Sequence, residues 1–375
     1  MTERERLSVA KRIVVKVGTS TLTHGTGRLD YGAIERLVHE IADLESAGRE
    51  MVLVTSGAVA AGCARIGTIE KPKTMQRKQA LAAIGQGVLM HVYERLFADC
   101  GKIVAQVLLT RSNALEYSQY KNSRSALLEL IEMGIIPVIN ENDAVAVEEF
   151  KIGDNDTLSA MVAALIDADA LIILTDIDGV YTANPSEDAN ARLIDEITAI
   201  TPEIEAMAGG AGSSFGTGGM TTKLEAAKMA HGAGVSMVIA SGQRENVLRG
   251  VLAGAAIGTI FPAREAHLKV RKSWLAVGKS LAGELTVDDG CEQALRQGSS
   301  LLSAGIIAVA GDFAKGSAVR VLTLDGREIA RGIVSVDAVT LVKLLGHRTA
   351  DFAHLLAGEN VPDEAIHRDN VVLLV

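Results

Sequence analysis

Over the first ~260 residues the chain alternates between two hydrophobic patterns. Short continuous apolar runs end in turn residues, and longer segments between them carry apolar residues at helical spacing. The segment 31–47, for example, places Ile34, Leu37 and Ile41 on one face and is followed by Gly48, which is typical of a helix and its end. This alternation predicts an α/β fold with a largely parallel sheet. The expected strands are 13–17, 51–54, 103–109, 135–139, 171–174 and 235–240, and the expected helices are 31–47, 75–97, 123–133, 157–166 and 223–230.

The pattern changes after residue 261. Pro262 precedes a basic stretch over residues 264–279, which has the character of a linker. Beyond it, short strand-like runs over 305–310, 318–324 and 332–336 are separated by Gly and Asp turns, which predicts a small β-rich barrel of about 80 residues. We therefore expect a first domain over 1–262, a linker over 263–280, a second domain over 281–359 and a C-terminal tail over 360–375.

Composition narrows the class of protein further. The 375 residues are 48% hydrophobic but only 3% aromatic, which suits layered helices and buried strands. The net charge of −9 gives no sign of binding to nucleic acid or to an anionic membrane. Cys63, Cys100 and Cys291 lie far apart and form no CxxC pair, so neither zinc nor a disulfide framework is indicated. With no signal core in residues 1–12 and no apolar run of ~20 residues, we expect a cytoplasmic protein away from membranes.

Two segments have the chemistry of a phosphate site. Lys16 lies inside the first expected strand, where an ammonium group is costly unless it meets an anion, and the sequence Gly-Thr-Ser follows it at 18–20. A glycine-rich stretch over 216–223 opens a helix and ends in Lys223, so backbone N–H groups and a cation face the same ligand. No GxxxxGK[ST] sequence occurs. Taken singly, the glycines fit a surface loop and Lys16 fits an edge lysine that reaches solvent. The nucleotide-binding candidates are Lys16, Thr217, Gly218, Gly219, Met220, Thr221, Thr222 and Lys223.

Other polar residues follow expected strands and fit a substrate that bears both a carboxylate and an amine. Ser56 directly precedes Gly57, a combination suited to carboxylate binding through hydroxyl and N–H groups. Asn140 and Asp143 follow the strand at 135–139, and the segment 153–156 precedes a helix, where its acidic residues could equally be helix caps. The substrate-site candidates are Ser56, Asn140, Asp143 and Asn155.

Thr175 and Asp176 follow the strand at 171–174 and could hold the adenine and ribose of a nucleotide, although alone they fit an ordinary turn. In open α/β sheets, ligands bind beyond the carboxyl ends of the strands. Because all of these motifs come just after expected strands, we expect them to share one site.

Five of these motifs together resemble the glutamate 5-kinases of the amino acid kinase superfamily. They are the segments 16–20, 55–58, 137–143, 153–156 and 216–223. Residues 281–359 resemble the PUA domain that many bacterial members carry, so the resemblance covers nearly the whole chain. It implies a three-layer αβα sandwich followed by a small, barrel-like PUA domain.

The resemblance also implies an activity, ATP-dependent phosphorylation of the γ-carboxylate of L-glutamate to L-glutamyl 5-phosphate, the first step of proline biosynthesis. It assigns Lys16 and Lys223 to the transferring phosphoryl group and Asp156 to ordering the lysines and Mg²⁺. By the same resemblance, Ser56, Asn140, Asp143 and Asn155 bind glutamate, whereas Thr175, Asp176 and the loop 217–223 hold ATP. It further implies feedback inhibition by L-proline and a downstream glutamate-5-phosphate reductase. We expect a homo-oligomer, a dimer or a tetramer.

Two alternatives stay open at this point. One is another kinase of the superfamily, acting on aspartate, acetylglutamate, carbamate or UMP. The other is an RNA-binding or RNA-modification protein that works through the PUA domain. Charge argues against RNA, because residues 281–375 hold 8 Lys and Arg against 13 Asp and Glu. The basic linker is the contrary feature.

Overall fold

The structure of this protein is a computed structural model, and it describes residues 2–24, 27–68, 72–110, 117–145, 155–185, 188, 190–208, 219–263, 281–347 and 362–374. Contacts between Cα atoms divide the chain into two compact units. The first comprises Met1–Ser112 and Asn122–Ala266, and the second comprises Asn113–Lys121 and His267–Val375. Each unit is described by itself below. Among the described residues, no helix is long and apolar enough to span a bilayer.

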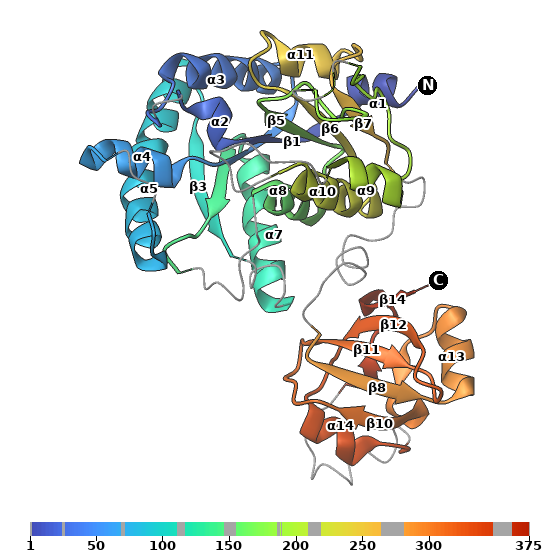
Figure 1. Ribbon diagram of the computed structural model, residues 1–375. Coiled ribbons are helices and arrows are strands. Elements are labelled where there is room, and N and C mark those ends of the chain that lie inside the picture. The colour runs from blue at the N-terminus through green and yellow to red at the C-terminus, as the bar shows by residue number, and fades with distance from the viewer. Residues whose placement is uncertain are drawn as a thin grey trace. The chain divides into compact units, whose positions relative to one another are not determined.

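The first unit is built on a seven-stranded sheet in the order β3-β4-β2-β1-β5-β6-β7 (Figure 1). Every neighbouring pair is parallel except β6 and β7, which are antiparallel. The largely parallel sheet predicted from the sequence is therefore confirmed. Its strands are β1 (Arg12–Val17), β2 (Glu50–Thr55), β3 (Val104–Leu109), β4 (Ile136–Glu141), β5 (Ala170–Thr175), β6 (Ser236–Ser241) and β7 (Thr259–Phe261).

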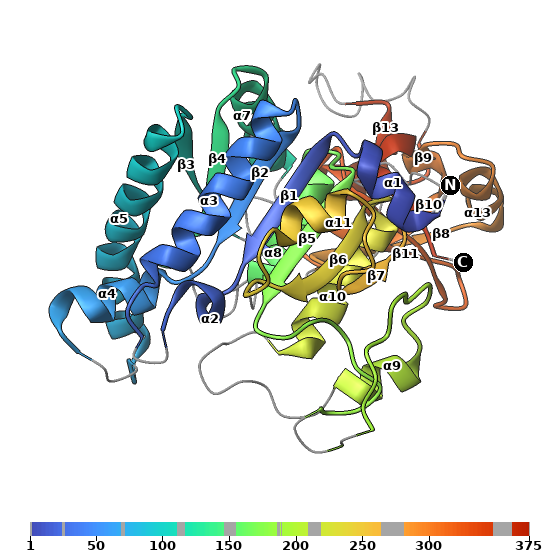
Figure 2. The same cartoon turned by 90° about the horizontal axis from the view of Figure 1, so that it is seen from above.

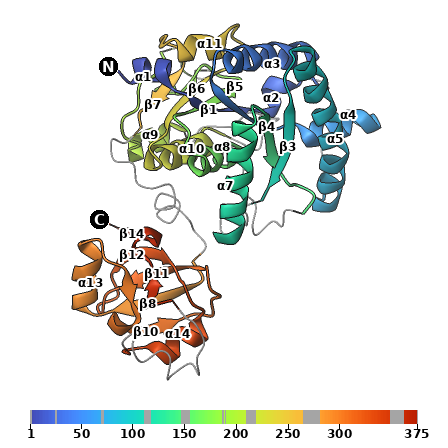
Figure 3. The same ribbon diagram turned by 180° about the vertical axis from the view of Figure 1, so that it is seen from behind.

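Helices cover both faces of this sheet, which gives the expected αβα layering (Figures 2 and 3). Helices α3, α5 and α11 lie on one face, and α8 and α10 lie on the other. The helices of the first unit are α1 (Glu3–Val9), α2 (Thr19–Leu22), α3 (Tyr31–Ser46), α4 (Ala58–Ile66), α5 (Met75–Asp99), α8 (Asn155–Leu165), α9 (Pro202–Ala208), α10 (Met220–Gly232) and α11 (Val247–Leu252). Helix α7 (Tyr117–Glu132) begins in the segment assigned to the second unit.

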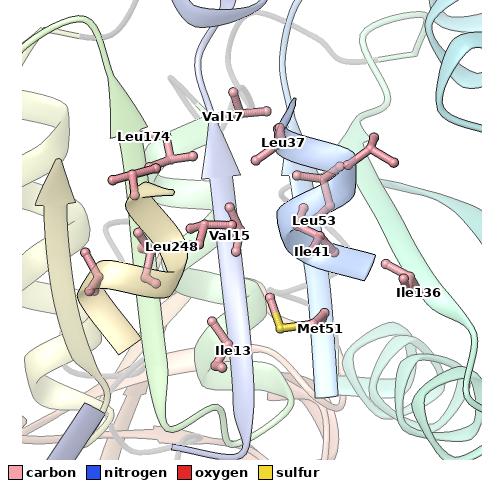
Figure 4. Close-up of a cluster of buried hydrophobic side chains, with 14 of the residues drawn as sticks. Ile13, Val15, Val17, Leu37, Ile41, Met51, Leu53, Ile136, Leu174 and Leu248 are labelled. Carbon is pink, nitrogen blue, oxygen red and sulfur yellow. The ribbon is translucent and has the colours of Figure 1, made fainter. Parts of the chain in front are cut away.

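Strand β1 shows how the core positions the site. Its residues Ile13, Val15 and Val17 point into a fully buried cluster that includes Leu37 of α3 and Leu248 of α11 (Figure 4). Side chains alternate between the two faces of a strand. The remaining face of β1 therefore turns Lys16 toward the layer of α8 and α10, where it forms an ion pair with a residue of α8.

The second unit contains a five-stranded mixed sheet in the order β10-β8-β11-β12-β14 and a separate pair, β9 with β13. Two details differ from the expected runs. Strand β12 begins at Glu328, ahead of the expected run 332–336. The hydrophobic pattern misses this start because the charged residues Glu328 and Arg331, which pair with each other, interrupt it. Strand β14 lies in the expected C-terminal tail and pairs with β12.

The elements of the second unit are β8 (Gly283–Val287), α13 (Asp289–Arg296), β9 (Leu301–Leu302), β10 (Ile306–Ala310), β11 (Ala318–Leu322), β12 (Glu328–Ile333), α14 (Ala338–Leu344), β13 (Glu364–Ile366) and β14 (Val371–Leu373). The expected linker, apart from residue 263, lies outside the described residues.

Helices α4 and α5 pack at unusually close range through two glycines. A Cβ atom added to Gly85 would lie 1.7 Å from the carbonyl oxygen of Ala58, and one added to Gly62 would lie 2.0 Å from the carbonyl oxygen of Leu81. Backbone atoms cannot yield as flexible side chains can. The depth at which α5 sits against α4 is therefore fixed by the absence of side chains at these two positions.

This packing predicts that alanine substitutions at two glycines of α5 change the stability of the fold in opposite directions. Gly85→Ala should destabilise the fold by about 1–3 kcal/mol because it overpacks the helix contact. Gly87→Ala should stabilise it by about 0.5–1 kcal/mol, since no atom lies within 4 Å of its added Cβ and alanine favours the helix. Urea denaturation of both variants measures the difference. Equal stabilities would contradict the close approach of α4 and α5.

Candidate active site

The carboxyl ends of the central strands bring the candidate residues to one edge of the sheet. After β1 the chain continues into β2 on one side, and it later returns as β5 on the other side of β1. Such a reversal of strand order opens a crevice at the carboxyl ends, where ligands of α/β proteins bind. Lys16 is the next-to-last residue of β1, directly at this reversal.

A completely buried carboxylate joins two lysines in this crevice. Asp156 has no exposed surface, and Lys16 and Lys223 are only 4% and 6% exposed. The Lys16 Nζ lies 2.6 Å from Asp156 Oδ1, and the Lys223 Nζ lies 3.1 Å from Asp156 Oδ2. Two cations thus share one anion. Buried charges are tolerated only when paired, so the excess positive charge makes this a site for a further anion.

Helix α10 supplies the second lysine and further donors. Gly219 is the N-cap residue of α10, and among the described residues no side-chain hydrogen bond caps this end of the helix. Thr222 donates from its hydroxyl to Asp156 Oδ2 at 3.0 Å, which fixes α10 to the first turn of α8. The arrangement of helix dipole, N–H groups and lysine suits a phosphate.

Next to the lysines lies a cluster of amide and hydroxyl groups centred on Asn155. The side-chain amide of Asn155 donates to the Thr55 carbonyl at 2.9 Å, to Ser56 Oγ at 2.8 Å and to Asn140 Oδ1 at 3.0 Å. Strands β2 and β4 pair in parallel; Thr55 ends β2, and Asn140 is the next-to-last residue of β4. Because Asn155 directly precedes Asp156 on α8, the amide cluster and the lysine pair form one continuous site.

A buried tyrosine supports the end of β2. Tyr93 of α5 is fully buried, and its hydroxyl lies 2.8 Å from Thr55 Oγ1, one residue before Ser56. Burial raises the pKa of the Tyr93 phenol far above its usual value, so the ring stays neutral. Nothing in the sequence of α5 marks Tyr93 as part of a site, because its spacing fits an ordinary core position.

The remaining expected nucleotide residues that the structure describes lie around the same edge. Thr175 ends β5, and its hydroxyl donates to Asp176 Oδ1 at 3.0 Å. Met220 and Thr221 occupy the first turn of α10. Thr217 and Gly218 lie outside the described residues.

The structure thus brings seven of the expected residues into contact. They are Lys16, Asp156, Thr222 and Lys223 around the carboxylate, and Ser56, Asn140 and Asn155 in the amide cluster. Asp143 lies just beyond β4 and is half-buried. Its part in the site stays a prediction.

The described residues contain no group of three or more His, Cys, Asp or Glu side chains that could hold a metal ion. Mg²⁺ commonly keeps several waters and binds substrate phosphates, so an ion that enters with a nucleotide would need few protein ligands.

Comparison with known proteins agrees with the geometry. Residues 11–241 match the amino acid kinase family, and residues 283–356 match the PUA domain. Among curated relatives, the glutamate 5-kinase of Moorella thermoacetica is 51% identical and covers 100% of both chains. That of Caldanaerobacter subterraneus subsp. tengcongensis is 49% identical over 97% of this chain and 98% of its own, and that of Carboxydothermus hydrogenoformans is 48% identical over 99% and 100%.

The fold and the site define an enzyme of the amino acid kinase type with a C-terminal PUA domain. The chain belongs to the amino acid kinase family, in its glutamate 5-kinase branch.

The buried ion pairs predict that replacing Asp156 costs far more stability than replacing an exposed aspartate. Asp156→Ala should destabilise the protein by about 3–5 kcal/mol, because it leaves two lysines buried without their counter-ion. Asp43→Ala removes the partner of Arg249 in an exposed ion pair and should cost less than about 1 kcal/mol. Urea denaturation compares the two. A similar small cost for both would show that Asp156 does not balance the buried lysines.

Proposed function

We propose that this protein transfers the γ-phosphoryl group of ATP to the γ-carboxylate of L-glutamate and forms L-glutamyl 5-phosphate, the first step of proline biosynthesis. The observation that carries the proposal is the buried Lys16–Asp156–Lys223 arrangement beside the amide cluster of Asn155. The names of the full-length relatives support glutamate as the substrate.

The two lysines supply the electrostatic part of catalysis. Phosphoryl transfer requires alignment of donor and acceptor and compensation of negative charge on the transferring group. Asp156 holds both ammonium groups in place and neutralises only one of them, so one net positive charge faces the phosphoryl group. A preorganised charge in a site without water is worth far more than in solution.

The acceptor needs no general base. An oxygen of the ionised γ-carboxylate attacks the γ-phosphorus in line with the bond to the leaving oxygen of ADP, and no proton has to be removed. Positioning is therefore the main task of the protein in this half of the site. Ser56, Asn140, Asp143 and Asn155 bind the amino acid, and their hydroxyl, amide and carboxylate groups suit its carboxylate and ammonium.

Membership in a kinase family implies ATP as the phosphoryl donor. Lys16, Thr175, Asp176 and the loop 217–223 hold the nucleotide in this proposal. Mg²⁺ would bind the nucleotide phosphates and reduce their negative charge.

The wider setting follows from the same proposal. We place the kinase domain at 1–262, a linker at 263–280 and the PUA domain at 281–359. The segment 360–375, expected as a tail, adds β14 to the sheet of the second unit. The enzyme acts in the cytoplasm as a homo-oligomer, hands its labile acyl phosphate to a glutamate-5-phosphate reductase and is inhibited by L-proline. We assign the PUA domain a structural or regulatory role, because its excess of acidic residues disfavours RNA.

Hydroxylamine trapping tests the activity. With ATP, Mg²⁺, hydroxylamine and L-glutamate, the protein should form the γ-hydroxamate, since hydroxylamine captures an acyl phosphate. Aspartate and acetylglutamate should give little signal. Hydroxamate from either of these acids instead of glutamate would overturn the proposed substrate, and no signal with any acid would overturn the proposed reaction.

Lys223→Ala tests the role of the second lysine. The variant should lose about 10²-fold or more in kcat with a smaller change in the KM for glutamate, because the lost charge acts mainly in the transition state. Lys228→Ala on the same helix is the matched control, since Lys228 is exposed and pairs with Glu205, and it should retain wild-type kcat. An unchanged kcat in folded Lys223→Ala would contradict the assignment.

A further inference from the structure

Helix α5 contributes a side chain to the amide cluster that the motifs do not include. Asn140 donates from Nδ2 to Gln86 Oε1 at 2.8 Å, so the hydrogen bonds continue from Asn155 through Asn140 to Gln86. We call these three side chains the amide relay. It runs from the first turn of α8 across the end of β4 to α5.

The direction of every amide in the relay is fixed by backbone groups. The backbone N–H of Glu141 donates to Asn140 Oδ1 at 2.9 Å, and an N–H can only donate. The Nδ2 group of Asn140 must therefore face Gln86, whose carbonyl oxygen accepts. At the other end, the Thr55 carbonyl can only accept, so Asn155 must turn its Nδ2 group toward it.

With the amides in these orientations, one donor and one acceptor of the relay are left without a partner among the described residues. Gln86 Nε2 and Asn155 Oδ1 are both buried, and neither has a hydrogen-bond partner among the residues that the structure describes. An unpaired buried polar atom is costly, so it is expected to be satisfied by a ligand. A free N–H₂ group suits a carboxylate, and a free amide oxygen suits an ammonium group. As one donor and one acceptor, the two atoms have the chemistry needed by the carboxylate and the ammonium of an α-amino acid.

The position of the relay agrees with this use. The two lysines lie on β1 and α10, whereas the far end of the relay, Asn140 and Gln86, lies on β4 and α5, and β4 is two strands from β1 in the sheet order. Asn155 and Asp156 are consecutive, and they serve the relay and the lysines respectively. An amino acid that binds across the relay and the lysine pair would have its side-chain carboxylate at the lysines and its head group at the relay.

The helix backbone that carries Gln86 is held in place by two contacts. It directly follows Gly85, where α5 approaches the backbone of α4 too closely for any side chain. Tyr93 lies seven residues further along α5 and contacts Thr55 beside the same cluster. Movement of this backbone away from the site would require α5 to break both contacts.

We propose that Gln86 is a specificity-determining residue that donates from Nε2 to the α-carboxylate of the bound amino acid. The inference rests on the proposed function and extends it to recognition of the substrate head group. Gln86 contacts the unreactive end of the substrate, so it acts on binding and not on phosphoryl transfer.

Two substitutions distinguish this role from a structural one. Gln86→Met keeps the length of the side chain and removes both polar groups. Gln86→Glu keeps an acceptor for Asn140 and replaces the free donor by a carboxylate oxygen. At alkaline pH, where the introduced carboxyl is ionised, the KM for L-glutamate should rise about 10- to 100-fold in Gln86→Met and further in Gln86→Glu. The kcat and the KM for ATP should change much less in both variants.

A substrate analogue adds a second arm. Because 4-aminobutyrate lacks the α-carboxylate, its inhibition constant against L-glutamate should be nearly the same in wild type and Gln86→Met, whereas that of glutarate should rise along with the KM for glutamate. Gln76→Met and Gln76→Glu, at an exposed position on the same helix, are the matched controls and should behave as wild type.

A wild-type KM in Gln86→Met, or a KM in Gln86→Glu no higher than in Gln86→Met, would overturn the proposal. Equal losses of kcat and ATP affinity would also overturn it, since they indicate general damage to the site. Hydroxamate formation by the wild-type enzyme tests the proposed function separately. A failure there is therefore distinct from a failure of the Gln86 assignment.

Discussion

The site depends on one interaction, the contact of a completely buried carboxylate with two lysines. Asp156 pairs with Lys16 from the central strand β1 and with Lys223 from α10, and it also accepts a hydrogen bond from Thr222. Removal of a carboxylate from water is costly, and only such pairing repays the cost. Asp156 therefore holds α8 and α10 against the sheet. Because it also leaves one positive charge in excess, the residue that stabilises this helix layer is the one that makes the site attractive to phosphate.

Much of this arrangement could be predicted from the sequence, because it follows local rules. The apolar runs around Val15 and Leu53 predict buried parallel strands, and the position of Lys16 at a strand end already indicates an anion site. The bridging of both lysines by Asp156 could not be derived from spacing alone. A residue at the start of α8 is a plausible helix cap, and only the packing of α8 between β1 and α10 turns it inward.

Other parts have no local signal. Gln86 and Tyr93 lie in a long helix in which a glutamine or a tyrosine is unremarkable, and their roles arise from the depth at which Gly62 and Gly85 let α5 approach α4. The apolar pattern also misses the start of β12, since the ion pair of Glu328 and Arg331 interrupts it there. These features depend on packing between segments far apart in the sequence, and the periodicity of a single segment carries no information about such packing.

The most direct measurement is a crystal structure of the enzyme with L-glutamate and a non-hydrolysable ATP analogue. Our account predicts that the γ-carboxylate lies in line with the terminal phosphate and that Lys16 and Lys223 are within hydrogen-bond distance of that phosphate. It also predicts the α-carboxylate at Gln86 Nε2 and the ammonium at Asn155 Oδ1. A glutamate bound in the opposite direction, or a terminal phosphate away from both lysines, would contradict it.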